Sequence, residues 1–507
     1  MDRGPPLINA MLTPDILGYI FELNASMTSY EKGSRYWMQH DSEAFLTIFW
    51  GSQVCSLWRD ILTDSPRLWG RVVDLFTFDT QEHLPLWSIM YLRTGNAPLD
   101  LKARIDANNE DAIVPFITTI VETSWNRFKS IDITFDRVRP LSLISSICER
   151  AAPSLVSFRV LYPDLWWDIQ IPSFSKLPFS GHAAYLQDVI LENTYIDLHT
   201  SWGGDNIRTF GIRNPKQRLN PTDLVQILSQ FPLLETLILF SVLDSSIDSI
   251  PFLTSPLHLR RLKYLSVGDD TCGRPPLAFL ASIKTEPTCG LHFDVTDRCG
   301  ESVPIRDIKV ALGNFARQHF DKHPPEELSV YVDGEDITIQ TASSDTKELA
   351  LYIRVQYGYG RFSQYCEVLE FMELQHSSSV TTLEVRIEDE SGPNQTLFWP
   401  LLARLFPNVQ VLKTTIFTFD LWFKSRLFES NPIIFPILRE FRVMPRFYVA
   451  ETINPDSFTE FFNVRKEQRI SIPAFYMPTR DGYGSKWRLN RSQVAELNIR
   501  WYEFVKE

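Results

Sequence analysis

A short apolar pattern recurs along this chain and constrains its fold more than any other feature. The segments FPLLETLIL (231–239), FPNVQVLKT (406–414) and FPILREFRV (435–443) place Phe-Pro before an apolar position 0, followed by apolar residues at +3 and usually +5. Without Phe-Pro, the pattern returns at Leu155/Phe158/Val160, Leu186/Val189/Leu191, Ile207/Phe210/Ile212 and Leu262/Leu265/Val267. The steps between positions 155, 186, 207, 234 and 262 are 31, 21, 27 and 28 residues, and 409 to 438 is 29. Such spacing is typical of a chain built from repeated structural units.

Each occurrence of the pattern predicts one β-strand. Positions +3 and +5 lie on the same face of a strand, and the turn into the strand brings position 0 to that side. Between the strands, NPTDLVQILSQ opens with a helix-start signal and NQTLFWPLLARLF carries apolar residues at helical spacing. One strand and one helix per unit at this period resemble leucine-rich repeats. We therefore expect an α/β fold in which residues 76–507 form an irregular leucine-rich-repeat solenoid.

This interpretation makes specific structural predictions. Consecutive strands should be parallel neighbours, with Leu237 and Phe441 buried, and the stacked units should leave a concave strand face. The asparagine that follows the last leucine of regular repeats has no consistent register here, so a mixed α/β domain remains an alternative for 270–375. The segment RSQVAELNIRWYEFVK (491–506) is expected to form a capping helix that closes the array.

Charge and composition limit the partners and the location of the chain. Its 50 Lys and Arg residues against 62 Asp and Glu residues give a net charge of -12, which disfavours a nucleic acid partner. No segment approaches the roughly 18–20 apolar residues of a membrane span. The first residues, MDRGPPLINAMLTPD, lack the order of a signal peptide, and six cysteines are too few for a disulfide scaffold in 507 residues. We expect a cytoplasmic or nuclear protein that binds neither nucleic acid nor membrane.

The N-terminal segment predicts a small helical module. In LTPDILGYIFEL, Thr13 is a suitable N-cap and Pro14 a suitable first helical residue. Two amphipathic helices follow from apolar arcs of roughly 160° each. The first arc contains Ile16, Leu17, Ile20, Phe21 and Leu23, and the second contains Val54, Cys55, Leu57, Trp58, Ile61 and Leu62. A third short helix is expected after Ser65-Pro66, and so small a bundle usually exposes apolar surface to a partner.

These segments also carry a family resemblance. LTPDILGYIFEL, followed after an insert by VCSLWRDILTDSPRLWGRV, resembles the F-box in the divergent form common in fungi. That form reads Leu-Pro-Pro-Glu-Ile-Leu, then Val-Cys-x-x-Trp-Arg-Asp, then Pro-x-Leu-Trp. Thr13 stands in place of its first proline and Asp15 in place of its glutamate, and the insert 24–53 matches no motif. The resemblance covers 8–75 and implies a three-helix module that docks on the Skp-type adaptor of a cullin–RING ubiquitin ligase.

Carried over position by position, the resemblance implies a docking surface with its immediate support. The residues of this set are Leu12, Pro14, Ile16, Leu17, Ile20, Val54, Trp58, Leu68 and Trp69. Within it, Ile20 and Trp58 are expected mainly to hold the helices together. The alternative is that these apolar residues only form a helical cap on the repeats.

No enzyme, cofactor or metal motif is complete in the sequence. Cys289, His292 and Cys299 lie close together with Cys272 upstream, but they lack the tight Cys-x-x-Cys pair usual in structural zinc sites. YGYGRF (357–362) and DGYGSKW (481–487) contain Gly-x-Gly without the remaining phosphate-binding residues. The acidic runs IEDES (387–391) and DGED (333–336) are interpreted as solvated edges or loops. We expect a non-enzymatic protein without a cofactor or metal.

Three functions are compatible with these features. The leading hypothesis is a substrate-recognition subunit of a Skp–cullin–F-box-type ubiquitin ligase, whose repeats bind an unknown protein target and so favour ubiquitin transfer by proximity. The alternative is a repeat-based interaction scaffold without a role in ubiquitination. Cullin would co-purify with the ligase subunit and would not co-purify with such a scaffold. The third is an enzyme with a site in 270–375, which a deep pocket lined by convergent polar residues would favour.

Overall fold

A computed structural model shows a mixed α/β protein with extensive parallel β-sheet. It describes residues 12–25, 43–75, 84–136, 141–162, 173–174, 178–196, 204–215, 217–244, 256–297, 305–333, 336–342, 351–357, 364–370, 377–388, 395–424, 434–444, 460, 463–464, 474–478 and 499–502. The chain forms two compact units, Met1–Val242 and Leu243–Glu507, and each is considered by itself. In both, helices connect many of the parallel strands, an arrangement compatible with a solenoid of repeated units.

Four described helices open the first unit, where the sequence predicts three. They are α2 (Pro14–Asn24), α3 (Glu43–Val54), α4 (Ser56–Thr63) and α5 (Pro66–Arg71). The single helix predicted over 54–62 is wrong, because Val54 ends α3 and Cys55 adopts an extended conformation before α4. The break has a packing reason, since it lets α3 and α4 bury their apolar faces together, with Gly51 of α3 against Leu62 of α4. The insert 24–53 thus supplies most of a helix.

Parallel strands in chain order form the sheet of the first unit. The described strands are β1 (Val73–Asp74), β2 (Leu99–Asp106), β3 (Phe128–Asp136), β4 (Ser157–Leu161), β6 (Asp188–Glu192), β8 (Thr209–Arg213) and β9 (Thr236–Phe240). A separate pair joins β5 (Ser173–Phe174) to β7 (Tyr195–Ile196). The strand expected in RVVDLFTF (71–78) is confirmed at β1, and 76–78 lie outside the described residues.

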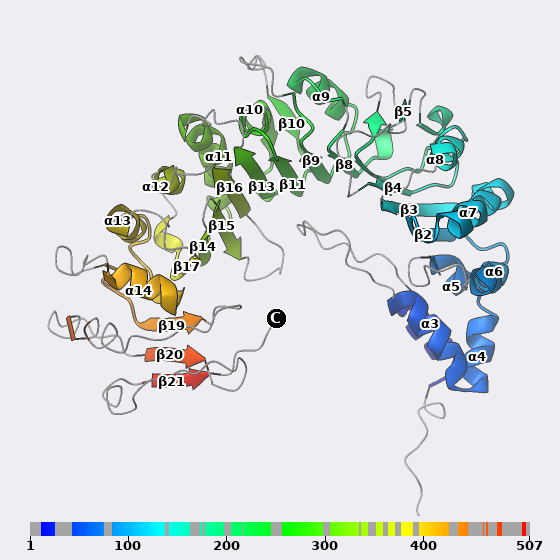
Figure 1. The fold of residues 1–507 in the computed structure, drawn as a ribbon, viewed down its shortest axis with the longest axis horizontal. Coiled ribbons are helices and arrows are strands. Elements are labelled where there is room, and N and C mark those ends of the chain that lie inside the picture. Colours follow the sequence, from blue (N-terminus) through cyan, green and yellow to red (C-terminus); the bar gives the residue numbers. More distant parts are fainter. Residues whose placement is uncertain are drawn as a thin grey trace, which may run out of the picture. The chain divides into compact units, whose positions relative to one another are not determined.

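Helices α7, α8 and α9 lie along one side of these strands (Figure 1). The connecting helices are α6 (Leu84–Arg93), α7 (Glu110–Ser124), α8 (Leu141–Cys148) and α9 (Pro221–Leu228), and the 3-10 turns are η2 (Trp125–Arg127), η3 (Pro178–Gly181) and η4 (Gly204–Asn206). Helix α9 begins as the sequence predicts, with Pro221 at its first position and the Asn220 side chain accepting a hydrogen bond from Thr222 N.

The strand register brings the predicted apolar positions into continuous rows. The +3 residues are register partners on successive strands: Phe158, Val189, Phe210 and Leu237. The +5 residues form a second such row: Val160, Leu191, Ile212 and Leu239. Both rows are buried, as are the position 0 residues Leu155, Leu186, Ile207 and Leu234. Each occurrence of the pattern in this unit is therefore confirmed as a strand that faces the core.

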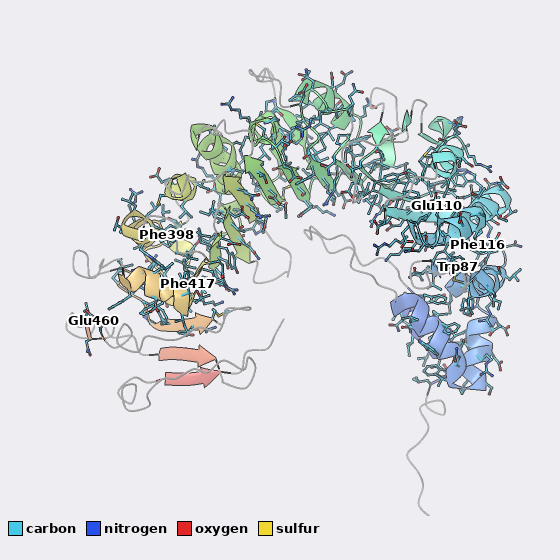
Figure 2. All side chains as sticks on the ribbon, in the orientation of Figure 1. Trp87, Glu110, Phe116, Phe398, Phe417 and Glu460 are labelled. Carbon is cyan, nitrogen blue, oxygen red and sulfur yellow. The ribbon has the colours of Figure 1, made fainter. Side chains whose placement is uncertain are left out.

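Aromatic side chains of α6 pack against α7. Trp87 of α6 is buried and its ring centroid lies 5.7 Å from that of Phe116 on α7. Both side chains are labelled in Figure 2. The neighbouring Tyr91 hydroxyl is 2.6 Å from Ser124 Oγ at the end of α7. These contacts fix α6 against the first strand–helix unit of the sheet.

The other face of this sheet carries charged residues. Lys102, Asp132 and Arg159 are register partners on neighbouring strands, and Arg159 Nη1 lies 4.0 Å from Asp132 Oδ2. Burial raises the pKa of Asp132, and the two cations oppose that shift. Arg104 bonds Asp136 at 2.6 Å along the same face. This face therefore remains polar while the opposite one forms the core.

Asp100 on β2 makes the stability of this face depend on pH. Burial raises the pKa of its carboxyl from 3.8 to about 6, against the opposing effect of Arg71 and Lys129. The free energy of unfolding therefore keeps its full value below pH 3.8, where the carboxyl is protonated in both states. It falls as the pH rises through about 6, because the buried carboxyl must then ionise. We expect Asp100→Asn to raise the free energy of unfolding by about 1–2 kcal/mol at pH 8 and to have little effect at pH 4.

Urea unfolding at both pH values measures this difference. Asp205→Asn is the control, since it removes an exposed carboxylate of the same unit. An equal gain from Asp100→Asn at pH 4 and pH 8 would contradict the assignment.

The sheet of the second unit departs from chain order at its centre. Its described strands are β11 (Tyr264–Asp269), β13 (Gly290–Asp297), β14 (Glu327–Asp333), β15 (Asp336–Ala342), β16 (Leu351–Tyr357), β17 (Thr382–Ile387), β18 (Val411–Thr415), β19 (Glu440–Met444), β20 (Ala474–Pro478) and β21 (Ile499–Tyr502). They pair in the order β11–β13–β16–β15–β14–β17–β18–β19–β20–β21. A separate parallel pair joins β10 (Leu257–Leu259) to β12 (Ile283–Thr285).

The expectation that consecutive strands are parallel neighbours is wrong for β14, β15 and β16. These strands form an antiparallel meander, so that β16, and not β14, pairs with β13. Strand β14 in turn pairs with β17. The physical reason is that Asp333 and Asp336 are register partners only three positions apart, which leaves no room for a helical crossover between β14 and β15. The mixed α/β arrangement left open for 270–375 is thus present inside an otherwise parallel sheet.

The parallel register resumes after the meander. Leu383, Leu412 and Phe441 are register partners on β17, β18 and β19, and all three are buried. Figure 1 shows α10, α11, α12 and α13 on one side of the strands of this unit. The helices are α10 (Arg274–Ser282), α11 (Ile305–Phe320), α12 (Gln364–Leu369), α13 (Gln395–Leu405) and α14 (Ile416–Lys424), with a 3-10 turn η6 (Ser377–Ser379). The predicted strands and the predicted helix at α13 are confirmed here.

A strand lies where the sequence predicts part of a capping helix. Ile499–Tyr502 form β21, which pairs in parallel with β20, so the helix expected over 491–506 is wrong at these four residues. The reason is pairing: Phe475 to Pro478 of β20 supply register partners for Ile499 to Tyr502. The remaining residues of the expected helix lie outside the described part of the chain, as does DGYGSKW and all of YGYGRF except Tyr357.

Candidate protein-docking surface on the N-terminal helices

Helix α2 starts where the sequence predicts and for the predicted reason. Thr13 is its N-cap, and the Thr13 Oγ1 atom accepts a hydrogen bond from Ile16 N at 3.4 Å. Pro14 occupies the first turn, where its missing N–H has no partner to lose, and Asp15 complements the positive end of the helix. The start of α2 is therefore fixed by the chain itself.

One side of α2 belongs to the core of the helical module. Leu17 and Phe21 are buried, and the Phe21 ring meets the Trp58 ring edge-on with centroids 5.1 Å apart. Gly51 of α3 lies beneath them, because a Cβ placed there would be 3.5 Å from Phe21 and 3.2 Å from Leu62. Helices α2, α3 and α4 thus share one small core.

Helix α5 is held by contacts with α4, with α6 and with the segment that enters β2. Trp69 is buried, its Nε1 donates a hydrogen bond to Leu62 O at 2.7 Å, and the Arg93 guanidinium lies 4.6 Å from the centre of its ring system. Gly70 follows and lies so close to Pro98 that a Cβ would be 2.2 Å from the Pro98 carbonyl oxygen. These contacts join α5 both to α4 and to the segment that enters β2.

The other side of α2 exposes large apolar side chains. Their exposed fractions are 46% for Ile16, 62% for Tyr19, 37% for Ile20 and 62% for Leu23. At 100° per residue these four side chains fall in an arc of about 100° beside the buried arc of Leu17 and Phe21. We call these four residues the α2 stripe. On α3, Trp50 and Val54 are 58% and 60% exposed and lie four residues apart, on one side of that helix.

The residues that the resemblance singles out divide between this surface and its support. Leu17, Leu68 and Trp69 are buried, and Leu12 and Trp58 are half-buried. Pro14, Ile16, Ile20 and Val54 are exposed. Trp58 lies against Phe21 as expected of a residue that holds the helices together, whereas Ile20 lies in the exposed α2 stripe. Helices α2 and α3 therefore display part of the set and the core contains the rest.

The docking set predicted from the sequence leaves out three exposed apolar residues, Tyr19, Leu23 and Trp50. Tyr19 and Leu23 follow Ile16 at +3 and +7, a spacing that places all three on one helix face. That spacing was sufficient to assign Tyr19 and Leu23 to the same helix face as Ile16. Trp50 lies in the insert 24–53, where no motif drew attention to a helix.

Potential metal ligands do not cluster in the described part of the chain. No three His, Cys, Asp or Glu side chains gather as metal ligands within the described ranges, and Cys299 lies outside them. Burial raises the pKa of Cys289 to about 12 and also raises that of Cys148, so both thiols stay protonated and unreactive at neutral pH. No described helix combines the length and apolar character needed to cross a membrane.

Comparisons with known proteins do not assign a family. No family model and no curated protein matches the chain. Among solved structures, it is similar to the leucine-rich repeat-containing protein LegL7 from Legionella pneumophila at 12% identity, over 73% of this chain and 89% of that one, with a TM-score of 0.28. A TM-score this low does not show a shared fold, so the architecture is inferred from the protein's own strands and helices.

Proposed function

We propose that the protein is the substrate-recognition subunit of a Skp–cullin–F-box-type ubiquitin ligase. The observation that carries the proposal is the α2 stripe, which leaves four large apolar side chains in water on a capped helix. Helix α2 buries one apolar arc in the core of the helical module and exposes a second apolar arc at the surface. Such an exposed arc is suited to an apolar partner. The F-box-like motifs, which lie on these same helices, support a Skp-type adaptor as that partner.

In this proposal the strand–helix units are an irregular leucine-rich-repeat solenoid that holds the target protein. The parallel rows of buried +3 and +5 residues support this interpretation of the units. The subunit itself would perform no chemistry. It would keep lysines of the target close to a ubiquitin-charged enzyme that the other subunits supply, and so raise the effective concentration of the reacting groups.

Binding of a purified fungal Skp-type adaptor to the full-length protein tests the proposal by calorimetry. We expect Ile20→Ser/Leu23→Ser to weaken this binding at least about tenfold, because exposed apolar anchors carry most of the energy of such an interface. Leu397→Ser on α13 is the matched control, since Leu397 is 58% exposed and lies in the other compact unit. Its adaptor affinity should equal that of the unchanged protein.

Two outcomes would contradict the proposal. If the folded, unchanged protein shows no affinity for the adaptor, the repeat-based scaffold without a role in ubiquitination becomes the better hypothesis. If the α2 variant binds as tightly as the Leu397→Ser control, the α2 stripe is not the docking surface. Circular dichroism of both variants shows whether their helices are intact.

A further inference from the structure

The antiparallel meander gives the second unit a broad polar sheet face. Side chains alternate along its strands, so that Leu328, Val330 and Val332 of β14 are buried whereas Ser329 and Tyr331 between them are half-buried. We call the half-buried side of β14, β15 and β16, with its register partners on β13 and β17, the meander face. It points away from the core, since strand side chains alternate between the two faces.

Aromatic rings are held rigidly on the meander face. The rings of His292 and Tyr352, which are register partners on β13 and β16, stack with centroids 4.4 Å apart and planes 16° from parallel. Farther along the same face, the guanidinium of Arg386 on β17 lies 5.2 Å from the centre of the Tyr331 ring on β14. Tyrosine is enriched among the anchors of protein interfaces because a rigid ring gains contact area at a small entropic cost.

A buried carboxylate fixes the orientation of Tyr331. Glu384 accepts hydrogen bonds from the Tyr331 hydroxyl at 3.2 Å, from Ser329 Oγ at 3.4 Å and from Arg386 Nε at 2.5 Å. Burial raises the pKa of Tyr331 to about 12, so its phenol stays protonated and continues to donate. The Tyr331 side chain is therefore ordered before any partner arrives, which lowers the entropy lost on binding.

Carboxylates gather where β14 meets its neighbours. Asp333, which is exposed, and Asp336 are register partners across the turn of the meander. Glu388 lies beside them, because its backbone N–H donates to Val332 O at 2.8 Å. Arg354 pairs with Asp336. Like charges opposite each other destabilise a sheet, so this end of the face is electrostatically suited to additional cations.

We infer that the meander face binds a basic segment of a partner protein, with Tyr331 and Tyr352 as anchors and Asp333 and Glu388 as partners for lysine or arginine. This inference rests on the target-binding half of the proposed function and names the chemistry of the target. The same carboxylates disfavour a nucleic acid, whose phosphates they repel.

A labelled 12-residue peptide in which lysine alternates with alanine serves as the probe, and its glutamate counterpart serves as the control peptide. Fluorescence anisotropy with the full-length protein at low salt should show binding of the lysine peptide that weakens as salt is added. We expect Asp333→Asn/Glu388→Gln to weaken it at least about threefold, in line with the loss of two partly exposed charge pairs. Asp205→Asn/Glu122→Gln is the matched variant, since it removes two exposed carboxylates from the first unit.

A stronger effect of the meander variant than of the matched variant supports the inference. It is overturned if the lysine peptide does not bind, if the glutamate peptide binds as well, or if both variants weaken binding equally through net charge. The adaptor titration is independent of these outcomes. An intact adaptor affinity with no peptide binding would reject this inference alone, and peptide binding without adaptor affinity would reject only the ligase assignment.

Discussion

Replacing Phe441 with alanine should lower the free energy of unfolding of the protein by about 3–5 kcal/mol. Phe441 is fully buried on β19, and its ring meets that of Phe419 on α14 edge-on with centroids 5.4 Å apart. Truncation removes this contact and leaves a cavity between the sheet and α14, which the close packing of both elements prevents from collapsing.

Urea unfolding followed by circular dichroism measures the loss. Ile437→Ala is the control, because Ile437 is 42% exposed in the turn that leads into the same strand and its truncation should have an effect below about 1 kcal/mol. A loss below about 1 kcal/mol at Phe441 as well would show that β19 does not contribute to the core in this way.

A second large effect is expected from Gly70→Ala in α5. The added methyl group would be 2.2 Å from the carbonyl oxygen of Pro98, a backbone atom that cannot rotate away. Either α5 or the segment that enters β2 must therefore shift, and Trp69, hydrogen-bonded to Leu62, restrains α5. Overpacking of this kind should destabilise the protein by about 2–3 kcal/mol or more.

Gly18→Ala gives the matched comparison, because no atom lies within 4 Å of a Cβ at Gly18 on α2. There the same substitution should stabilise the protein by about 0.5–1 kcal/mol, since alanine favours a helix over glycine. Thermal unfolding of both variants reads out the opposite signs. Destabilisation by both to a similar extent would mean that the approach of α5 to Pro98 is not the cause.

The strands that carry the repeated apolar pattern were accessible from the sequence because one local rule specifies them. Apolar residues at +3 and +5 must share a strand face, and Phe210 and Ile212 do so within the five-residue strand β8. Helix starts were accessible for a similar reason. Thr13 and Asn220 each accept a hydrogen bond from their own helix, an interaction that depends only on residues two or three positions away.

Strand order was not accessible, because it depends on contacts distant in the sequence. The residues of β14 and β15 alternate between apolar and polar in the same way whether their neighbours are parallel or antiparallel. Only the antiparallel pairing of β14 with β15, in which Val330 is the register partner of Ile339, distinguishes the two arrangements. The break at Cys55 was missed similarly, since Val54 and Leu62 fit one helical arc as well as two separate helices.

The candidate docking surface was predictable in its position but not in its detail. The apolar arc of α2 was evident from the sequence, yet nothing in the arc tells that Leu17 is covered by the module whereas Leu23 is exposed. That division is set by α3 and α4, which cover one side of α2. Because α3 lies in a segment without a recognisable motif, the exposed Trp50 was out of reach as well.

The meander also separates two modes of folding within one chain. In the first unit each strand pairs with the next strand of its sheet. Folding can therefore spread from any strand to the next one along the chain. In the second unit such spreading is interrupted, because Thr296 meets Gln356 and Tyr331 meets Glu384 across 60 and 53 residues. Only two residues separate β14 from β15, the smallest separation among the described strands of that sheet, so we expect this hairpin to form early in the folding of the second unit. Strand β16 would then join β15 and strand β17 would join β14, followed by β13 on β16, so that the unit would grow outward from its middle.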